Sequence, residues 1–407
     1  MLVALGSAVG VRLWRTHRWD FSPEVARLVE QGDSQEWRGD TKRNLSNAER
    51  AYRRALSLDR GNPLLEAQLA ALLCRLEAQF PAPGRRQEIH GLTERAVERA
   101  PDYPMPWLAR TKLLLLEGKP REAEQAARET IRRDRDFDRG YSMLGEALIG
   151  QGKLEEGLAE IRHGVEVGKG YLRARLILAA RLQNASRYDE AAAEFRTVLS
   201  YDPDHPTALE NLGAIYLING RYLDAIPYIR KVFEETHDSR SANSLGIAYF
   251  NLNRMDEAID AFKMAYRLDS SPVAARNVAE CYEKMGRERD ARHWCEAAIA
   301  SVDASSVTGG PRAELLNSRA FCAAKLGRYD EALANVQEAR KLKPKQNSFL
   351  FRAAQICAMA GRREEVYSYT RQAVQAGYSR EDFRRDLAFR DFQDDPRFRS
   401  ILESAAQ

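Results

Sequence analysis

The sequence predicts an all-α solenoid, in which pairs of helices repeat along the chain and stack on one another. A six-residue phrase, typified by Gly-Arg-Tyr-Asp-Glu-Ala, recurs at intervals of 33 or 34 residues, with a single interval of 41. Its last residue stands at Ala123, Gly157, Ala191, Ala225, Ala258, Ala291, Ala332 and Val366. These last residues form a first column of equivalent positions. A second column follows the same period twelve residues earlier, at Thr111, Gly145, Ala179, Gly213, Gly246, Ala279, Ala320 and Ala354. Two columns locked to one period indicate a repeat array.

Each repeat has the pattern of a helix, a tight turn and a second helix. Before the phrase, apolar residues fall at helical spacing, as at Leu209, Leu212 and Tyr216. The Gly or Asn that opens most phrases tolerates the left-handed conformation that ends a helix, and the acidic residues after it favour the start of the next. The second helix often ends at a breaker such as Asp202-Pro203. One such pair cannot bury its apolar face alone, so it must stack on its neighbours.

These positions resemble the tetratricopeptide repeat (TPR) family, as found in bacterial TPR proteins that end in a capping tail. The unit that matches best carries Leu209, Leu212, Gly213, Tyr216, Ala225, Ile229 and Val232. The resemblance implies a right-handed superhelix of antiparallel helix pairs, whose concave groove is lined by the first helix of each pair. It also implies that this groove binds a peptide or a protein.

The repeat pattern divides the chain into four expected parts. Residues 1–20 form a short apolar segment, and residues 21–103 hold degenerate TPR-like repeats. Eight clear repeats follow over residues 104–377, with a flexible loop insert at 303–311 that explains the long interval. Residues 378–407 break the pattern and are similar to the capping helices that close many bacterial TPR arrays.

The first residues leave three interpretations open. Met1–Val11 carries no charge, and Arg12, Arg15 and Arg18 follow it. A spanning helix needs about 20 apolar residues, more than this segment supplies. It is therefore a frayed helix, a partial or interfacial membrane anchor, or the end of a longer transmembrane helix. The expected location is accordingly cytoplasmic, or membrane-associated through residues 1–20.

The composition and motifs favour binding over catalysis. With 63 Lys and Arg against 59 Asp and Glu, the formal charge is only +4, so no nucleic-acid partner is expected. The five cysteines form no CxxC pair, and the six histidines form no helical i, i+4 pair. No phosphate-binding loop or nucleophile elbow is present. We therefore expect no enzyme, no catalytic residue, no metal and no cofactor, while an enzyme with an unfamiliar site stays an alternative.

A set of Arg and Asn residues falls at groove-facing positions of the first helices. Asn amides pair with an extended peptide backbone and Arg pairs with carboxylates, so these residues are the predicted peptide-binding site. They are Arg173, Asn211, Arg240, Asn243, Arg276, Asn277 and Asn317. The full carboxylate clamp of some TPR proteins is not reproduced. The predicted function is a protein-interaction scaffold, and the alternative is a regulatory or assembly subunit of a membrane-associated bacterial complex in secretion or signalling.

Overall fold

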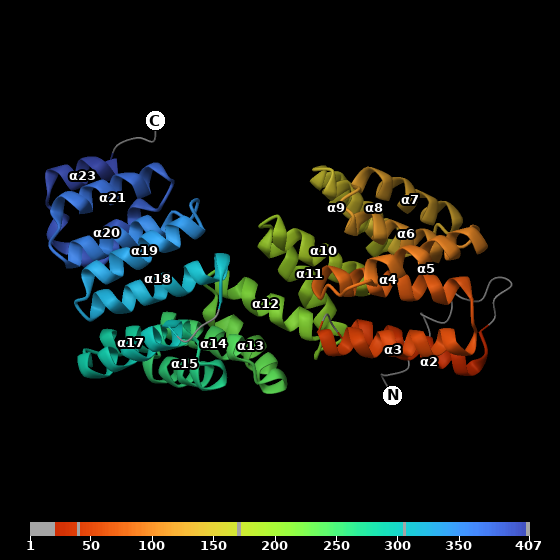
Figure 1. Ribbon diagram of the computed structural model, residues 1–407, viewed down its shortest axis with the longest axis horizontal. Coiled ribbons are helices and arrows are strands. Elements are labelled where there is room, and N and C mark those ends of the chain that lie inside the picture. Colours follow the sequence, from red (N-terminus) through yellow and green to blue (C-terminus); the bar gives the residue numbers. More distant parts are fainter. Residues whose placement is uncertain (1–20, 39–40, 169–171, 304–306, 404–407) are drawn as a thin grey trace. The chain divides into compact units, whose positions relative to one another are not determined.

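The computed structural model describes residues 21–38, 41–168, 172–303 and 307–403, and every regular element in these ranges is a helix. The predicted architecture, an all-helical array of antiparallel helix pairs, is confirmed (Figure 1). Residues 1–20, on which the anchor prediction falls, lie outside the described residues. Within the described ranges, no helix combines the length and the apolar composition needed to cross a membrane.

The chain forms two compact units, Met1–Asn219 and Gly220–Gln407, which we call unit 1 and unit 2. In unit 1 the helices pair in chain order, α2 with α3 and so on to α10 with α11, and α12 packs on α11. The helices are α2 (Pro23–Trp37), α3 (Lys42–Leu58), α4 (Pro63–Gln79), α5 (Arg85–Arg99), α6 (Pro104–Leu116), α7 (Pro120–Arg133), α8 (Asp138–Gly150), α9 (Leu154–Val167), α10 (Leu172–Asn184), α11 (Tyr188–Tyr201) and α12 (Pro206–Ile218).

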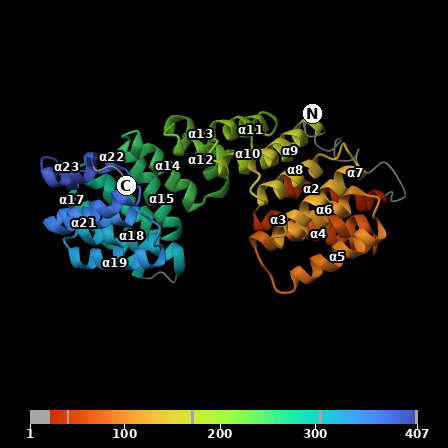
Figure 2. The same cartoon turned by 90° about the horizontal axis from the view of Figure 1, so that it is seen from above.

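Unit 2 continues the same order, and its successive helices stack on one another (Figures 1 and 2). At its C-terminal end α23 packs on α21, and η2 packs on α20. The helices are α13 (Tyr222–Thr236), α14 (Ser239–Asn251), α15 (Met255–Asp269), α16 (Pro272–Lys284), α17 (Glu288–Asp303), α18 (Gly309–Lys325), α19 (Tyr329–Leu342), α20 (Ser348–Met359), α21 (Arg363–Gln375), α22 (Arg380–Arg385), the 3₁₀ helix η2 (Leu387–Phe392) and α23 (Pro396–Glu403). The predicted insert at 303–311 therefore overlaps the start of α18.

The two sequence columns meet between α8 and α9, which explains why both have a small residue in this helix pair. Gly145 of α8 and Gly157 of α9 show this most clearly. A Cβ atom added at Gly145 would lie 2.5 Å from the carbonyl oxygen of Gly157, and one added at Gly157 would lie 2.6 Å from that of Gly145. Real Cβ atoms do not approach backbone oxygen so closely, so the columns mark the points of closest contact between paired helices.

The residue that opens each phrase adopts the left-handed conformation that the sequence predicts there. It has a positive φ in all eight turns, at Gly118, Gly152, Ser186, Gly220, Asn253, Gly286, Gly327 and Gly361. Glycine carries no steric penalty in this region, whereas an L-residue with a Cβ does. The turns at Ser186 and Asn253 are therefore strained relative to the other six.

Replacing Ser186 by glycine is expected to stabilise unit 1 by about 0.5–1 kcal/mol, because it relieves the left-handed strain at a modest entropic cost. Urea unfolding followed by circular dichroism measures the change. Ser46 lies inside α3, so Ser46→Gly is the matched control and is expected to destabilise by about 0.5–1 kcal/mol. Equal effects of the two substitutions would contradict the assignment of strain to Ser186.

The hydrophobic core runs along the stack of helices in each unit. In unit 1 its centre is α4, which is apolar on most faces and is contacted by α3, α5 and α6. A helix that is apolar all round must be surrounded by other elements. In unit 2 the core ends in four phenylalanines of the last segment, Phe383, Phe389, Phe392 and Phe398, all of which are buried.

Candidate functional site

Three of the predicted binding residues meet on the first helices of unit 2. The Asn277 amide of α16 donates to Asn243 Oδ1 of α14 at 3.0 Å. Arg276 donates from Nη2 to Asn277 Oδ1 at 2.7 Å, so a guanidinium and two amides form a connected chain across α14 and α16. Asn277 is only 7% exposed, which means that this chain is held in place by packing.

A second set of hydrogen-bonded polar residues begins on α20, and its members were not among those predicted. Arg352 donates to Gln355 Oε1 at 2.8 Å, and Gln355 donates to Asp386 Oδ2 just after α22. Burial, reinforced by the nearby guanidinium of Arg276, lowers the pKa of Arg352 to about 10. We call Asn243, Asn277, Arg276, Arg352, Gln355 and Asp386 the polar row.

Two buried polar atoms on the first helices of unit 2 have no hydrogen-bond partner among the described residues. They are Asn317 Oδ1 on α18 and Arg352 Nε on α20. The Arg352 guanidinium also lies over the Phe321 ring of α18, 4.9 Å from its centroid. Buried polar groups are almost always satisfied, so one acceptor and one donor in this position suit a ligand that offers both.

The other predicted residues are distributed over both units. Arg240 is exposed on α14. Asn211 belongs to α12 of unit 1, and its amide donates to the backbone oxygen of Thr207 at 2.7 Å. Arg173 on α10 of unit 1 pairs with Glu36 of α2, with Arg173 Nη1 3.1 Å from Glu36 Oε2. The structure thus joins Asn243, Arg276 and Asn277 by hydrogen bonds in unit 2, where Arg240 and Asn317 also lie, whereas Asn211 and Arg173 belong to unit 1.

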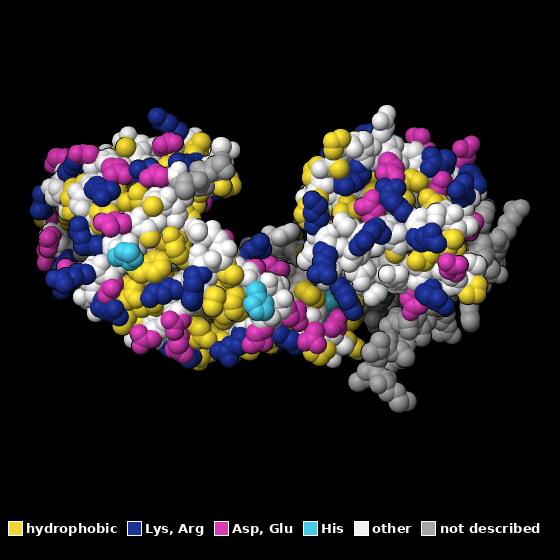
Figure 3. All heavy atoms as spheres, turned by 60° about the horizontal axis from the view of Figure 1, so that its bottom comes forward, with side chains coloured by type: hydrophobic (Ala, Val, Ile, Leu, Met, Phe, Trp, Pro, Cys, Tyr) yellow, Lys and Arg dark blue, Asp and Glu magenta, His cyan; other side chains and the backbone are white. Residues whose placement is uncertain are grey.

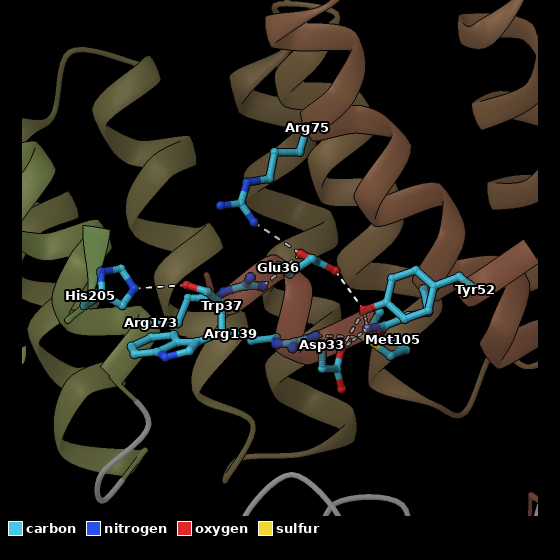
Figure 4. A network of polar contacts seen from close by, with 10 residues as sticks. Asp33, Glu36, Trp37, Tyr52, Arg75, Met105, Arg139, Arg173 and His205 are labelled. Atoms are coloured by element: carbon cyan, nitrogen blue, oxygen red, sulfur yellow. Dashed lines mark hydrogen bonds and ion pairs between the residues drawn. The ribbon is translucent and has the colours of Figure 1, made fainter. Parts of the chain in front are cut away.

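Glu36 is the centre of a buried ionic cluster in unit 1 (Figure 4). Its side chain is 4% exposed, accepts from Tyr52 at 2.9 Å and pairs with Arg75 at 3.3 Å as well as with Arg173. Burial alone would raise the pKa of Glu36, but Arg173, Arg75, Lys112 and Arg139 outweigh it and hold that pKa well below its usual range. We call Asp33, Glu36, Arg75, Lys112, Arg139 and Arg173 the ionic cluster.

A second contact joins the end of α2 to the start of α12. The Trp37 indole donates to Asp202 Oδ2 at 2.9 Å, and His205 Nε2 lies 3.0 Å from the Trp37 carbonyl oxygen. His205 is 1% exposed, and burial lowers its pKa, so the neutral ring is favoured. Its other nitrogen accepts from the backbone N–H of Ala208, which caps α12. The first helix of unit 1 therefore contacts helices far along the chain.

Other chemistry-bearing residues do not assemble into a site. Among the described residues, no group of three or more His, Cys, Asp or Glu side chains could hold a metal ion. The five cysteines are all buried and unpaired. The displayed face of each unit carries both basic and acidic side chains (Figure 3).

Sequence reasoning missed Arg352 and Arg139, although the repeat phase contained the signal. Arg352 stands two residues before Ala354, as Asn277 stands before Ala279, and Arg139 occupies the same phase as Arg173 and Arg240. Extending each column along the whole array would have found both. Glu36 carries no comparable signal, because it lies before the clear repeats.

Comparison with known sequences identifies the same repeat. The family model of the tetratricopeptide repeat matches residues 178–235, 235–275 and 245–306, and a second model of this repeat matches residues 313–346. DnaJ homolog subfamily C member 3 of Homo sapiens is 23% identical over 242 residues, which cover 57% of this chain and 47% of that protein. Protein O-mannosyl-transferase TMTC1 of Homo sapiens is 24% identical over 199 residues, covering 48% of this chain and 22% of that protein. The matches therefore span less than half the length of these curated relatives.

Among solved structures, a tetratricopeptide repeat protein from Parabacteroides merdae aligns with a TM-score of 0.47 and 18% identity. The alignment covers 61% of this chain and 97% of that one.

Proposed function

Because the chain is a tetratricopeptide-repeat protein, and such repeats generally bind other proteins and are non-catalytic, we propose that unit 2 holds an extended partner segment along the polar row. The observation that carries this proposal is the hydrogen-bonded chain from Asn243 through Asn277 to Arg276. It links the first helices of two successive repeats, so several polar groups are already ordered before a ligand arrives. Preorganised groups lose little conformational entropy on binding, which favours affinity.

The chemistry of the polar row suits a peptide backbone that carries an acidic group. Asn243 uses its oxygen within the row, so its amide nitrogen is placed to donate to a peptide carbonyl. The guanidinium of Arg276 can donate to a ligand carboxylate. Burial, and after it the guanidinium of Arg276, lowers the pKa of Arg352, and a ligand carboxylate beside it would stabilise its charged form.

The proposal is tested with peptides selected from a random display library on the full chain. Binding of a selected peptide is then measured by fluorescence anisotropy for Arg276→Ala, Asn277→Ala and Arg352→Met. Each variant is expected to bind about tenfold more weakly or worse, because each loses a hydrogen bond that involves a charged group or an ordered amide.

The matched control is Arg287→Ala, since Arg287 pairs with the exposed Asp290 and lies outside the polar row. Its affinity is expected to equal that of the unaltered chain. Unchanged binding by all three polar-row variants would overturn the proposal, and so would an equal loss in the control.

A further inference from the structure

His205 joins the start of α12 to the end of α2 through both nitrogens of its ring. Nδ1 accepts from the backbone N–H of Ala208 at 3.3 Å, so this nitrogen carries no proton. In the neutral ring the proton is therefore on Nε2, which donates to the Trp37 carbonyl oxygen at 3.0 Å (Figure 4). The two contacts require one tautomer of the neutral ring, and they leave no place for a second proton.

A second proton on His205 would reverse the role of Nδ1. A charged imidazole has two N–H donors, so Nδ1 would then face the Ala208 N–H as one donor against another. That contact would be lost, and with it the side-chain cap of α12. Because one rigid ring makes both contacts, turning Nδ1 away from Ala208 also moves Nε2 away from the Trp37 carbonyl oxygen.

The groups around His205 do not offer a charged ring a place without disturbing Trp37. From α2 the ring meets the Trp37 indole, with ring centroids 4.4 Å apart, and from α10 the guanidinium of Arg173 acts against a positive charge. Asp202, before α12, attracts such a charge, but its Oδ2 atom already accepts from the Trp37 indole at 2.9 Å. Asp204, also before α12, is exposed. A charged ring that turned toward Asp202 would therefore compete with the indole.

We propose that His205 is an acid-sensitive latch, whose protonation releases the end of α2 from the start of α12. Burial lowers the pKa of His205, so the contribution of the latch is fully present above the ordinary histidine pKa of 6.5. It is lost as the pH falls from 6.5 toward the lowered pKa. The ion pair of Glu36 with Arg173 persists over this range, because the pKa of Glu36 is held well below 4.5. Mild acid would therefore loosen this closure of unit 1 without unfolding the unit.

Nuclear magnetic resonance of the full chain from about pH 8 to about pH 4.5 tests the latch. The ring signals of His205, assigned by their loss in His205→Asn, and the indole N–H signal of Trp37, assigned by its loss in Trp37→Phe, are expected to change with one shared midpoint below pH 6.5. In His205→Asn the Trp37 signal is expected to stay constant, because Asn caps a helix without titrating. His163 is exposed on α9, so His163→Asn is the matched control and should leave the shared transition unchanged.

A second measurement needs no variant. The protection of the Ala208 amide against hydrogen exchange is expected to fall at least about fivefold as His205 is protonated, as for the loss of an N-cap. The matched amide is that of Ser241, which donates at 2.9 Å to the Asp238 carboxylate at the start of α14. Hydrogen bonds outweigh burial and lower the pKa of Asp238, so this cap stays charged and the protection of Ser241 should stay constant. A Trp37 signal that does not follow His205, or one that titrates alike in His205→Asn, would overturn the proposal, and so would constant protection of Ala208.

Discussion

Replacing Glu36 by alanine is expected to lower the free energy of unfolding of unit 1 by about 3–5 kcal/mol. Glu36 is the carboxylate shared by Arg75 and Arg173, and it accepts from the Tyr52 hydroxyl. Without it, these two guanidiniums and Lys112 would remain near one another with no opposite charge at their centre. Removing one partner of a buried ion pair costs far more than the pair itself contributes, because the remaining charge stays desolvated.

Urea unfolding of the full chain, with hydrogen exchange to localise the change to unit 1, measures this effect. Glu30 is exposed on the same helix, so Glu30→Ala is the matched control and is expected to stay within about 0.5 kcal/mol of the unaltered chain. A Glu36→Ala variant as stable as Glu30→Ala would show that the ionic cluster contributes nothing. Adding Arg173→Met to Glu36→Met should recover part of the lost stability, since both charges are then gone.

Glu36 also determines how the stability of unit 1 changes at acid pH. The pKa of Glu36 in the folded chain lies below its ordinary value of 4.5, so its contribution is fully present above that value. This contribution is lost as the pH falls below 4.5 toward the folded-state pKa. Burial raises the pKa of Asp33, which therefore acts in the opposite direction and reduces the net effect. Glu36→Gln should remove the larger part of this acid-dependent loss.

Replacing Phe398 by alanine is expected to lower the free energy of unfolding of unit 2 by about 3–5 kcal/mol. Phe398 is fully buried, with its ring centroid 5.7 Å from those of Phe389 and Phe392 and 6.3 Å from that of Phe383. Truncation would leave a cavity among these rings and loosen α23, which packs on α21. The last helix pair would then expose apolar surface that the terminal segment now covers.

The control for this variant lies in the same segment. Leu387 is 83% exposed, so Leu387→Ala should change the stability by less than about 0.5 kcal/mol. Both variants are compared by urea unfolding, with hydrogen exchange reporting on α20 and α21. Equal stability of the two variants would contradict a packing role for the phenylalanine cluster.

The elements of this fold could be predicted because they depend on local rules. A left-handed residue follows the first helix in all eight turns, and small residues stand where the paired helices α8 and α9 touch, at Gly145 and Gly157. The same phase located Asn243, Arg276, Asn277 and Asn317 on the first helices and contained Arg352 as well. Periodicity fixes which face of a helix a residue occupies, so the helix and the face of these residues could be predicted.

The ionic cluster could not be predicted in the same way. Glu36 and Arg173 are 137 positions apart, and their contact depends on how several successive helix pairs pack and curve. Small rotations between repeats add up along the array, and sequence period alone does not determine them. The expectation that Arg173 faces a ligand considered only its own helix, whereas the structure supplies a carboxylate from α2.

The contacts that join α2 to α10 and α12 also set how unit 1 can change in evolution. Solenoids usually tolerate the gain or loss of a repeat, because each repeat touches only its neighbours. In unit 1, deleting or duplicating one helix pair between α3 and α10 would move Arg173 and His205 one repeat away from Glu36 and Trp37. The contacts of Glu36 with Arg173 and of Trp37 with His205 therefore limit the number of repeats that unit 1 can contain.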